Sequence, residues 1–425
     1  MMNTLMSNEF SLALPMTPVP PVGLNEEEQS APALATILQQ LDRLLDLTPA
    51  ARRQHDNFYA LVLEGQPLIA LTHPDHAQHV FQRPHIYPKA FHRGVATCHD
   101  DERLAQLRLL RPQFHRRRLT ALCDLMVTTI DAELQCWSAP DSPPLDLMEA
   151  MSNTTRAVLS RSMFGAALPQ TAYAQLAEAL VTLVEHAPSD DSAQTLRTTP
   201  ILQPALAVYD VLFDQALIYH QTQGQGEEGS LLAMLLDMGD ARTGKTLSVA
   251  QLRDEILFIF FVGFENIASG LAHAFHLLMQ HPDKLARLQA EVDEVLAGEW
   301  PTLESVNRLV YAGRVLQETL RLYPAVAWLT RTVAIDDRIA GHLVPAGARV
   351  MLAAKLYQSD PEFWPNPEVF EPERFRPENV VSHHPCAWLP FGKGQRFCLG
   401  KDFALMEGKL ILAMVLQRFD FMPNE

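Results

Sequence analysis

The chain has 425 residues, of which 34 are Lys or Arg and 50 are Asp or Glu, so its formal net charge is −16. Hydrophobic residues make up 48% and charged residues 20%, a composition typical of a folded globular protein and not of a disordered one. This acidic balance argues against non-specific binding to nucleic acid or to an anionic membrane surface.

The N-terminal segment does not have the pattern of a signal peptide. Prolines at positions 15, 18, 20 and 21 would break the apolar helix that such a peptide needs, and three glutamates follow at 26–28. We therefore predict a loosely held arm over residues 1–30. The longest apolar stretch, residues 256–264, is far shorter than the ~20 residues that cross a bilayer. Five scattered cysteines without C-x-x-C spacing fit a reducing compartment, so we expect a cytoplasmic protein without a membrane segment.

Helical periodicity dominates the chain from residue 31 onward. Leucines at 38, 41, 44 and 45 form one apolar stripe, and residues 104–114 form another. Alternating runs at 60–71 and 338–352 contain turn residues between β-forming residues and predict hairpins. We find no internal repeat and no Ser/Gly linker between two cores. The sequence predicts a mainly α-helical chain with small β-sheets, folded as a single domain over residues 31–425.

One match to a phosphate-binding motif is not interpreted as a functional site. Residues 239–246 read GDARTGKT, which matches the phosphate loop G-x-x-x-x-G-K-[ST]. That loop needs a buried strand before it and a helix that starts at its Lys-Thr pair, but the preceding residues 230–238 have helical spacing and a helix cap follows only at Ser248. Lys245 is interpreted as a solvated loop charge.

Two helical stretches in the second half of the chain have distinctive patterns. Residues 254–280 are apolar on nearly every face, which predicts one long buried helix. Glu318 and Arg321 lie three residues apart on another helical stretch, so they share a face on which an ion pair can form.

The most specific pattern is a cysteine loop, LPFGKGQRFCLGKDFALMEGKLI, at residues 389–411. Two glycines permit a tight turn that brings the backbone close to a flat cofactor. Cys398 stands just before a helical stretch, and both the helix N-terminus and Arg396 stabilise a thiolate there. Gly400 leaves no side chain in the way of the cofactor. An axial thiolate ligand to haem iron requires this arrangement, whereas an inert buried cysteine does not explain the fixed offsets.

With these residues, the chain resembles the cytochrome P450 family, whose four sequence landmarks recur in the right order. They are the oxygen-side helix around residues 262–266, the E-x-x-R pair at 318–321, the P-E-R-F motif at 372–375, and the loop F-G-x-G-x-R-x-C-x-G. The resemblance spans about residues 104–418. It implies the cytochrome P450 fold, a haem b cofactor with Cys398 as the axial iron ligand, and a monooxygenase that uses O2.

The resemblance also implies which residues support the cofactor. Glu318, Arg321 and Arg374 are expected to form a structural charge network beneath the haem, which is favourable only when every member is paired. The residues expected to contact the haem are Arg108, Arg331, Phe391, Gly392, Arg396 and Gly400. The tryptophan of the family's W-x-x-x-R pattern is Leu104 here, so one usual propionate donor is missing.

The oxygen-side helix departs from the family pattern A/G-G-x-D/E-T. Gly263 and Glu265 match it, but Val262 replaces the small residue and Asn266 replaces the threonine. We predict Glu265 and Asn266 as the catalytic pair, although an amide lacks the transferable proton of a hydroxyl. Three interpretations stay open: Asn266 positions a relay water, the helix serves an unusual oxidation such as coupling or ring formation, or oxygen activation is poor.

An apolar wall over the haem is implied by the same resemblance. The expected substrate contacts are Phe260, Gly263, Phe264, Val326, Ala327 and Trp328. They predict a largely apolar small-molecule substrate of modest size, oxidised in secondary metabolism. Residues 82–98 and 186–220 are expected to form variable access lids, in which His92, Arg93 and His186 are candidates for contacting a polar substituent.

No flavin or nicotinamide fingerprint follows residue 400, so we expect electrons from a separate ferredoxin or flavodoxin. Its docking surface is predicted to contain Arg116, Arg117, Arg118, Lys393 and Lys401, basic residues on a chain of net charge −16. We expect a monomer that binds neither nucleic acid nor a membrane. Family members usually continue beyond the cysteine helix into strands that return to the pocket. We expect that these strands are either truncated or part of a disordered segment beyond residue 425.

Two other functions stay open. In the first, the chain is an enzyme of the same fold that catalyses an atypical reaction (coupling, ring formation, peroxide-driven or redox-neutral). In the second, it is a non-catalytic haem-binding sensor. Peroxygenases of the superfamily have an Arg-Pro pair on the oxygen-side helix, and residues 263–266 contain none.

Overall fold

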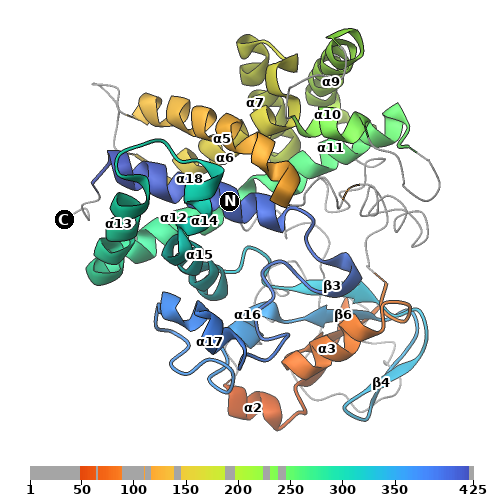
Figure 1. Cartoon of the computed structure of the whole chain (residues 1–425). Coiled ribbons are helices and arrows are strands. Elements are labelled where there is room, and N and C mark those ends of the chain that lie inside the picture. The colour runs from red at the N-terminus through yellow and green to blue at the C-terminus, as the bar shows by residue number, and fades with distance from the viewer. Residues whose placement is uncertain are drawn as a thin grey trace. The chain divides into compact units, whose positions relative to one another are not determined.

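Helices form most of the described structure, and strands gather in two small sheets (Figure 1), so the predicted fold class is confirmed. The computed structural model describes residues 48–63, 66–88, 110, 116–137, 145–186, 197–223, 230–237 and 246–420. The chain divides into two compact units, Met1–His92 with Leu320–Cys398, and Arg93–Thr319 with Leu399–Glu425. The single domain over residues 31–425 stays a prediction, and the arm over residues 1–30 lies outside the described residues.

The first unit contains both sheets. The larger one has the order β1-β2-β6-β3, formed by β1 (Phe58–Leu63), β2 (Gln66–Leu71), β6 (Arg349–Leu352) and β3 (Leu329–Thr332). The smaller one pairs β4 (Asp337–Ile339) with β5 (His342–Val344). The hairpin predicted at 60–71 is β1–β2, and the run at 338–352 forms β4–β5 and then β6, so both predictions are confirmed.

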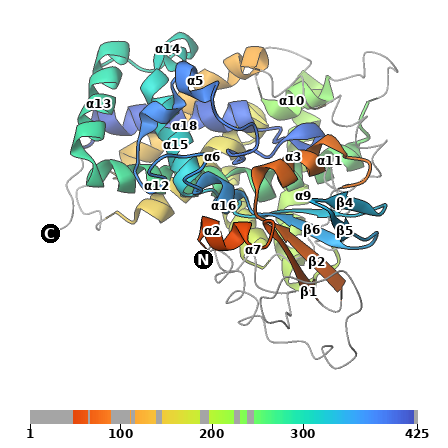
Figure 2. The ribbon, with the colours of Figure 1, turned by 90° about the horizontal axis from the view of Figure 1, so that it is seen from below.

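Strand β2 lies between β1 and β6 in the larger sheet, as Figure 2 shows. It pairs antiparallel with β1 and parallel with β6, where Ile69 lies opposite Val350. Residues 68–71 of β2 are all buried, which is typical of a strand covered on both faces. Strand β3 pairs antiparallel with β6 and places Arg331 opposite Val350.

Short helices complete the first unit. They are α2 (Pro49–Arg53), α3 (Pro74–Gln82), α16 (Ala354–Gln358), η4 (Pro372–Phe375), α17 (Pro377–Val380) and η5 (Gly394–Arg396). Proline stands at the first helical position of α2 and α3, where its missing N–H costs nothing. A buried ion pair between Arg52 and Asp360, 2.7 Å apart, fastens α2 to the segment that follows α16.

The second unit is helical. Its helices are α5 (Arg116–Trp137), α6 (Leu147–Phe164), η2 (Gly165–Ala167), α7 (Gln170–Glu185), η3 (Pro200–Leu202), α9 (Gln203–Gln223), α10 (Leu231–Leu236), α11 (Val249–Gly263), α12 (Glu265–Gln280), α13 (Pro282–Leu296), α14 (Leu303–Arg308), α15 (Val310–Leu322) and α18 (Lys401–Arg418). The last residues of α15, from Leu320, belong to the first unit. Helix α6 packs against α5, α7 and α12.

The predicted long helix over residues 254–280 is interrupted. It starts earlier, at Val249, where Ser248 and Gln251 form a capping box, and Phe264 separates α11 from α12. The break was not predicted because the apolar pattern is continuous across it. Helix α10 precedes the phosphate-loop match, as expected, and residues 239–245 of that match lie outside the described residues.

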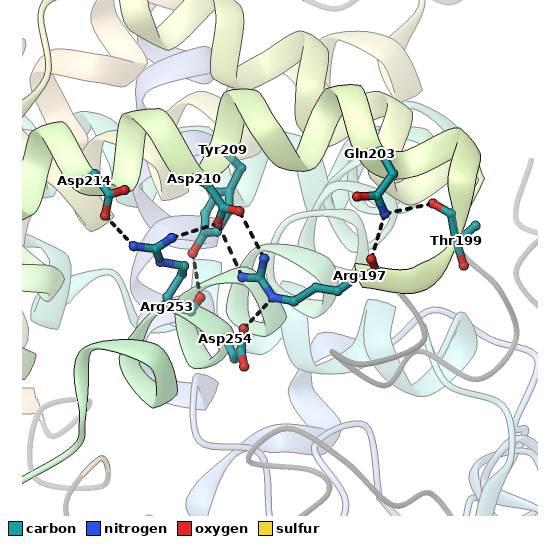
Figure 3. Close-up of polar contacts among 8 residues, drawn as sticks. All are labelled: Arg197, Thr199, Gln203, Tyr209, Asp210, Asp214, Arg253 and Asp254. Carbon is teal, nitrogen blue, oxygen red and sulfur yellow. Dashed lines mark hydrogen bonds and ion pairs between the residues drawn. The ribbon is translucent and has the colours of Figure 1, made fainter.

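An ion-pair network fastens α9 to α11 (Figure 3). The Arg197 guanidinium donates to Asp210 at 3.0 and 3.3 Å and to Asp254 at 2.9 Å. Arg253 donates to Asp214 and lies 3.5 Å from Asp210. Three carboxylates from two helices therefore surround two guanidinium groups. Arg197 lies between Asp210 and Asp254, and Arg253 lies between Asp210 and Asp214.

Two helices of the described chain are long and apolar enough to cross a membrane by length and composition, Pro200–Thr222 and Val249–Gln280. In the second, 61% of the most apolar window is buried within the protein, against 44% in the first. Core helices of globular proteins meet the same criteria, so these two properties do not assign a membrane segment.

Candidate functional site

The cysteine loop in the first unit is formed by two sharp turns. Gly392 and Gly394 have φ angles of +65° and +75°, left-handed values that favour glycine. A Cβ atom on Gly394 would lie 3.3 Å from the carbonyl oxygen of Phe81. The Cys398 N–H donates to the Phe391 carbonyl at 2.9 Å, which closes the loop and leaves the Cys398 residue exposed.

The described cysteines differ in how well they could act as a thiolate ligand. Burial raises the pKa of the Cys123 and Cys386 thiols to about 11, so both are poor thiolates at neutral pH. Cys136 is exposed on α5, but no glycine turn or helix start accompanies it. Cys398 precedes the N-terminus of α18 by three residues in the chain, and helix N-termini favour a thiolate.

Gly400 is the N-cap of α18, and its carbonyl accepts from the Ala404 N–H at 2.8 Å. A Cβ atom there would meet no described atom within 4 Å, so the position is open on that side. A thiolate-ligated haem needs a sulfur donor and room beside it. The exposed Cys398 supplies the donor, and Gly400 has no side chain to fill the room. The residues of the loop therefore fit this cofactor.

Arg321 stabilises the segment that leads to the cysteine loop. It is 1% exposed and donates to the backbone carbonyls of Gln358 at 2.8 Å and Val369 at 3.3 Å. Its guanidinium also lies 5.3 Å from the centre of the Trp364 ring. Arg374 donates to the Asn366 carbonyl at 2.7 Å, so both arginines bind the stretch 366–369.

Gln358 extends this connection to the cysteine loop. Its side-chain amide donates to the carbonyls of Leu320 and Arg321 at 2.9 and 3.0 Å, and its Oε1 accepts from the Leu389 N–H at 2.9 Å. Glu318 is fully buried one turn before Arg321. Its pairing with the two arginines stays a prediction. Gln358 itself was missed, because nothing in the local sequence marks a buried glutamine as a link.

Arg331 lies close to the cysteine loop within the first unit. It is buried on β3, donates to the Thr330 carbonyl at 2.7 Å and lies 5.5 Å from the Phe81 ring centre. Phe81 is also the residue that a side chain on Gly394 would contact. Phe81 therefore links the predicted propionate ligand to the loop, a role that its position on α3 did not signal in the sequence.

The break between α11 and α12 uses the side chain that replaces the family's threonine. Asn266 Nδ2 donates to the Val262 carbonyl at 2.9 Å, the oxygen that would accept the Asn266 backbone N–H in a continuous helix. Asn266 and Val262 are both exposed. The amide therefore satisfies a carbonyl at the break, and its Oδ1 is the acceptor that can hold a water.

Glu265 is the first residue of α12 and is half-buried. Burial raises the pKa of its carboxyl, while the nearby Arg156 charge lowers it and Glu185 raises it. A carboxyl group whose pKa is raised toward neutrality is suited to exchange protons.

The predicted substrate contacts occupy different environments. Phe260 is 0% exposed and packs on Phe164 and Tyr209, with ring centres 5.8 and 6.4 Å apart, which favours core packing for it. A Cβ on Gly263 would lie 2.7 Å from Leu159 Cδ2, so close helix packing explains this glycine.

In the first unit, Trp328 is buried in the core beside the partly buried Ala327, whereas Val326 is 38% exposed. In the second unit, the Phe264 side chain is buried. Whether these residues contact a substrate stays a prediction.

Several predicted residues lie outside the described part of the chain. Arg108 is one of them, as are His92 and Arg93, and residues 89–98 and 187–196 of the proposed lids also lie outside it. The backbone of Arg116, Arg117 and Arg118 forms the first turn of α5, but their side chains, like that of Arg396, are not described. Lys393 donates to the Pro385 carbonyl, and Lys401 is the first residue of α18.

Comparisons with known proteins agree on one family. The family model Cytochrome P450 matches residues 27–425. Cyclooctatin synthase of Streptomyces melanosporofaciens is 30% identical over 387 residues, which cover 87% of this chain and 84% of that protein. Cyclooctat-9-en-7-ol 5-monooxygenase of the same species is 27% identical, covering 83% and 79%. The crystal structure of the cytochrome P450DA heme domain superimposes with a TM-score of 0.79 at 26% identity, covering 92% of this chain and 86% of that one.

Proposed function

The chain belongs to the cytochrome P450 family, and on that premise we propose that it oxidises a largely apolar small molecule with O2 and electrons from a ferredoxin or flavodoxin. Membership makes it a haem-containing oxidoreductase that incorporates oxygen. The observation that supports this function best is the exposed Cys398 on a loop of two left-handed glycines directly before α18.

The residues proposed to hold the haem are Cys398 as the iron ligand, Phe391, Gly392 and Gly400 as the loop beside the ring, and Arg108, Arg331 and Arg396 for the propionates. Covalent attachment of a c-type haem uses C-x-x-C-H, which this sequence lacks, so we propose haem b. When bound, the haem supplies the one-electron and O2 chemistry.

The other residues have supporting roles in this proposal. Arg321 and Gln358 fix the backbone that leads to Leu389 and so position the cysteine loop. Glu265 takes up and releases protons at its carboxylate on the oxygen side. Asn266 holds a water at Oδ1 while its amide satisfies the Val262 carbonyl.

The proposed substrate is a hydrocarbon-rich alcohol formed in secondary metabolism. This proposal draws on Cyclooctat-9-en-7-ol 5-monooxygenase, whose name describes oxidation of an unsaturated alcohol. The predicted contacts are mostly apolar residues, which suits a substrate of that kind. An atypical oxidation such as coupling or ring formation is the second candidate, because Asn266 offers no hydroxyl proton next to Glu265.

We further propose a cytoplasmic monomer. Its electron donor would dock on the basic first turn of α5, where Arg116, Arg117 and Arg118 follow one another. An acidic donor would be steered to this basic turn, and its binding should weaken as salt is raised.

The test starts from the purified holoenzyme. A screen of hydrophobic alcohols for a type-I spectral shift identifies binders, and each binder is then tested for O2 consumption and product with a ferredoxin system. Binders without product would favour the sensor, and product formed only with added peroxide would exclude the ferredoxin-fed function.

Cys398→Ser is expected to abolish the thiolate-type carbonyl spectrum, because a hydroxyl does not replace a thiolate as a soft ligand. Cys136→Ser is the matched control, since Cys136 is the other exposed cysteine among the described residues. Survival of the thiolate spectrum in Cys398→Ser would overturn the assignment of the iron ligand.

A further inference from the structure

Helix α15 ends just before the predicted substrate contacts of the first unit. Its last residue is Leu322, and Pro324 follows two residues later, which disfavours a helical conformation for Tyr323. The last four carbonyls of a helix have no partner within the helix. Other groups must therefore satisfy the end of α15 before the chain continues to Val326 and Ala327.

Two side chains of α16 supply three of these partners. Gln358 Nε2 donates to the carbonyls of Leu320 and Arg321 at 2.9 and 3.0 Å. Lys355 Nζ donates to the carbonyl of Leu322, the last residue of α15. A positive charge at the C-terminal end of a helix is also stabilised by the helix dipole. The short helix α16 therefore holds the end of α15.

Lys355 also binds the other end of the stretch 322–327, through its backbone. Its N–H donates to the Ala327 carbonyl at 3.1 Å, which satisfies a donor that the first turn of α16 cannot satisfy itself. Its ammonium lies 5.6 Å from the centre of the Tyr323 ring, within the range of a cation–π contact. One residue thus contacts the chain at positions 322, 323 and 327, on both sides of Val326.

The place of Lys355 is unfavourable for a charge. The residue is half-buried, and burial and the charge of Arg321 lower the pKa of its ammonium. The hydrogen bond to the Leu322 carbonyl and the contact with the Tyr323 ring offset this cost. In the sequence, Lys355 stands alone between apolar residues, so no local pattern signals these contacts.

We propose that Lys355 is a positioning residue for substrate binding: by fixing the stretch 322–327 at both ends, it sets where the Val326 side chain meets the substrate and so contributes to which apolar molecules are accepted. Val326 is 38% exposed, so its place depends largely on the backbone that carries it. The inference rests on the proposed function, in which Val326 and Ala327 contact the substrate.

The test compares two azoles that ligate haem iron through the same kind of nitrogen. In the holoenzyme, the dissociation constants of imidazole and 4-phenylimidazole are measured from the spectral shift that nitrogen ligation causes. Imidazole reports on the iron site alone, whereas the phenyl ring of 4-phenylimidazole is expected to contact the apolar residues beside it. Lys355→Met should reduce the preference for 4-phenylimidazole by about three- to tenfold, the effect of losing part of one apolar contact. The imidazole constant should stay unchanged.

Two further variants separate positioning from folding. Lys355→Arg should retain the wild-type preference, because a guanidinium also donates to a carbonyl and lies over an aromatic ring. Lys409→Met is the matched control, since Lys409 is also half-buried and its Nζ donates to the Val306 carbonyl in the last turn of α14 at 3.3 Å. Lys355→Met and Lys409→Met should both lower the thermal unfolding midpoint, but only Lys355→Met should change the preference.

An unchanged preference in Lys355→Met would overturn the inference. If that variant does not retain haem, Tyr323→Leu, which removes the exposed ring under the ammonium, should shift the preference in the same direction, and no shift would overturn the inference equally. Val326→Ala should itself reduce the preference. Adding Lys355→Met to it should then have little effect, because the two residues act through one contact.

A full effect of Lys355→Met in the Val326→Ala background would show that Lys355 acts elsewhere and would also overturn the inference. The azole constants need no turnover, so the proposed function is judged separately. If wild type binds the screened alcohols but forms no product with the ferredoxin system, the proposed function fails while the azole comparison stands.

Discussion

At the residue scale, Asn266 shows what a sequence pattern can and cannot reveal. Its amide in place of the family's threonine was visible in the sequence, and so was the lack of a hydroxyl proton. That Nδ2 is used for the Val262 carbonyl was not visible, because the need for a donor arises only where α11 breaks. Gly263 is similar: the sequence placed it beside a substrate, but the close atom is in Leu159, 104 residues earlier, which no local pattern identifies.

The prediction at this scale concerns the two roles of Asn266. Asn266→Thr should preserve or improve the coupling of electron use to product, because a threonine hydroxyl can donate to the carbonyl four residues earlier and has a transferable proton. Asn266→Ala should raise the peroxide-to-product ratio, because the proposed water loses its acceptor. The ratio is measured for wild type and both variants with one substrate. Equal ratios in all three would make Asn266 a packing residue or a substrate contact.

At the element scale, the network between α9 and α11 gives a prediction about stability. Arg197 lies between Asp210 and Asp254, and all three side chains are 28–36% exposed, so each pair alone is worth under ~1 kcal/mol. Arg197→Met removes two pairs at once and leaves three carboxylates around one guanidinium. We expect a loss of about 1–2 kcal/mol in the free energy of unfolding, measured by urea denaturation.

The control for this prediction is the exposed pair of Arg53 and Glu362, 3.0 Å apart with side chains 51% and 47% exposed. Arg53→Met should change the free energy of unfolding by less than ~0.5 kcal/mol. Adding Asp254→Asn to Arg197→Met should recover part of the loss by relieving repulsion between carboxylates. Equal effects of Arg197→Met and Arg53→Met would contradict a cooperative network.

At the scale of the whole molecule, local signals predicted the elements but not their partners. The alternation at 60–71 and 338–352 gave the strands, yet the parallel pairing of Ile69 with Val350 joins residues 281 positions apart and has no local signature. Helical periodicity predicted the class of the fold. The break at Phe264 was missed because the residues that contact it, Thr155 and Leu159, lie on α6, far away in the sequence. The cysteine loop was predictable because its glycine offsets are themselves the turn geometry.

The last prediction follows from such a long-range connection. Arg321 is 1% exposed and binds the carbonyls of Gln358 and Val369, and Gln358 in turn binds the Leu389 N–H before the cysteine loop. Arg321→Ala removes the donor that these two buried carbonyls share. It also removes the predicted partner of Glu318. A loss of roughly 3–5 kcal/mol is expected when one member of a buried charge network is removed, so stable haem incorporation should fail.

Arg321→Lys should fail as well, because one ammonium cannot reproduce the planar fork that reaches two carbonyls. Arg338→Ala is the matched control, since Arg338 also donates to a backbone carbonyl in the same unit, that of Gly341 at 2.8 Å, but at the surface. It should retain haem. The measurement is the haem-to-protein ratio after purification, with circular dichroism to follow folding. Full haem occupancy with a reduced rate in Arg321→Ala would contradict a structural role and would indicate that Arg321 takes part in the reaction.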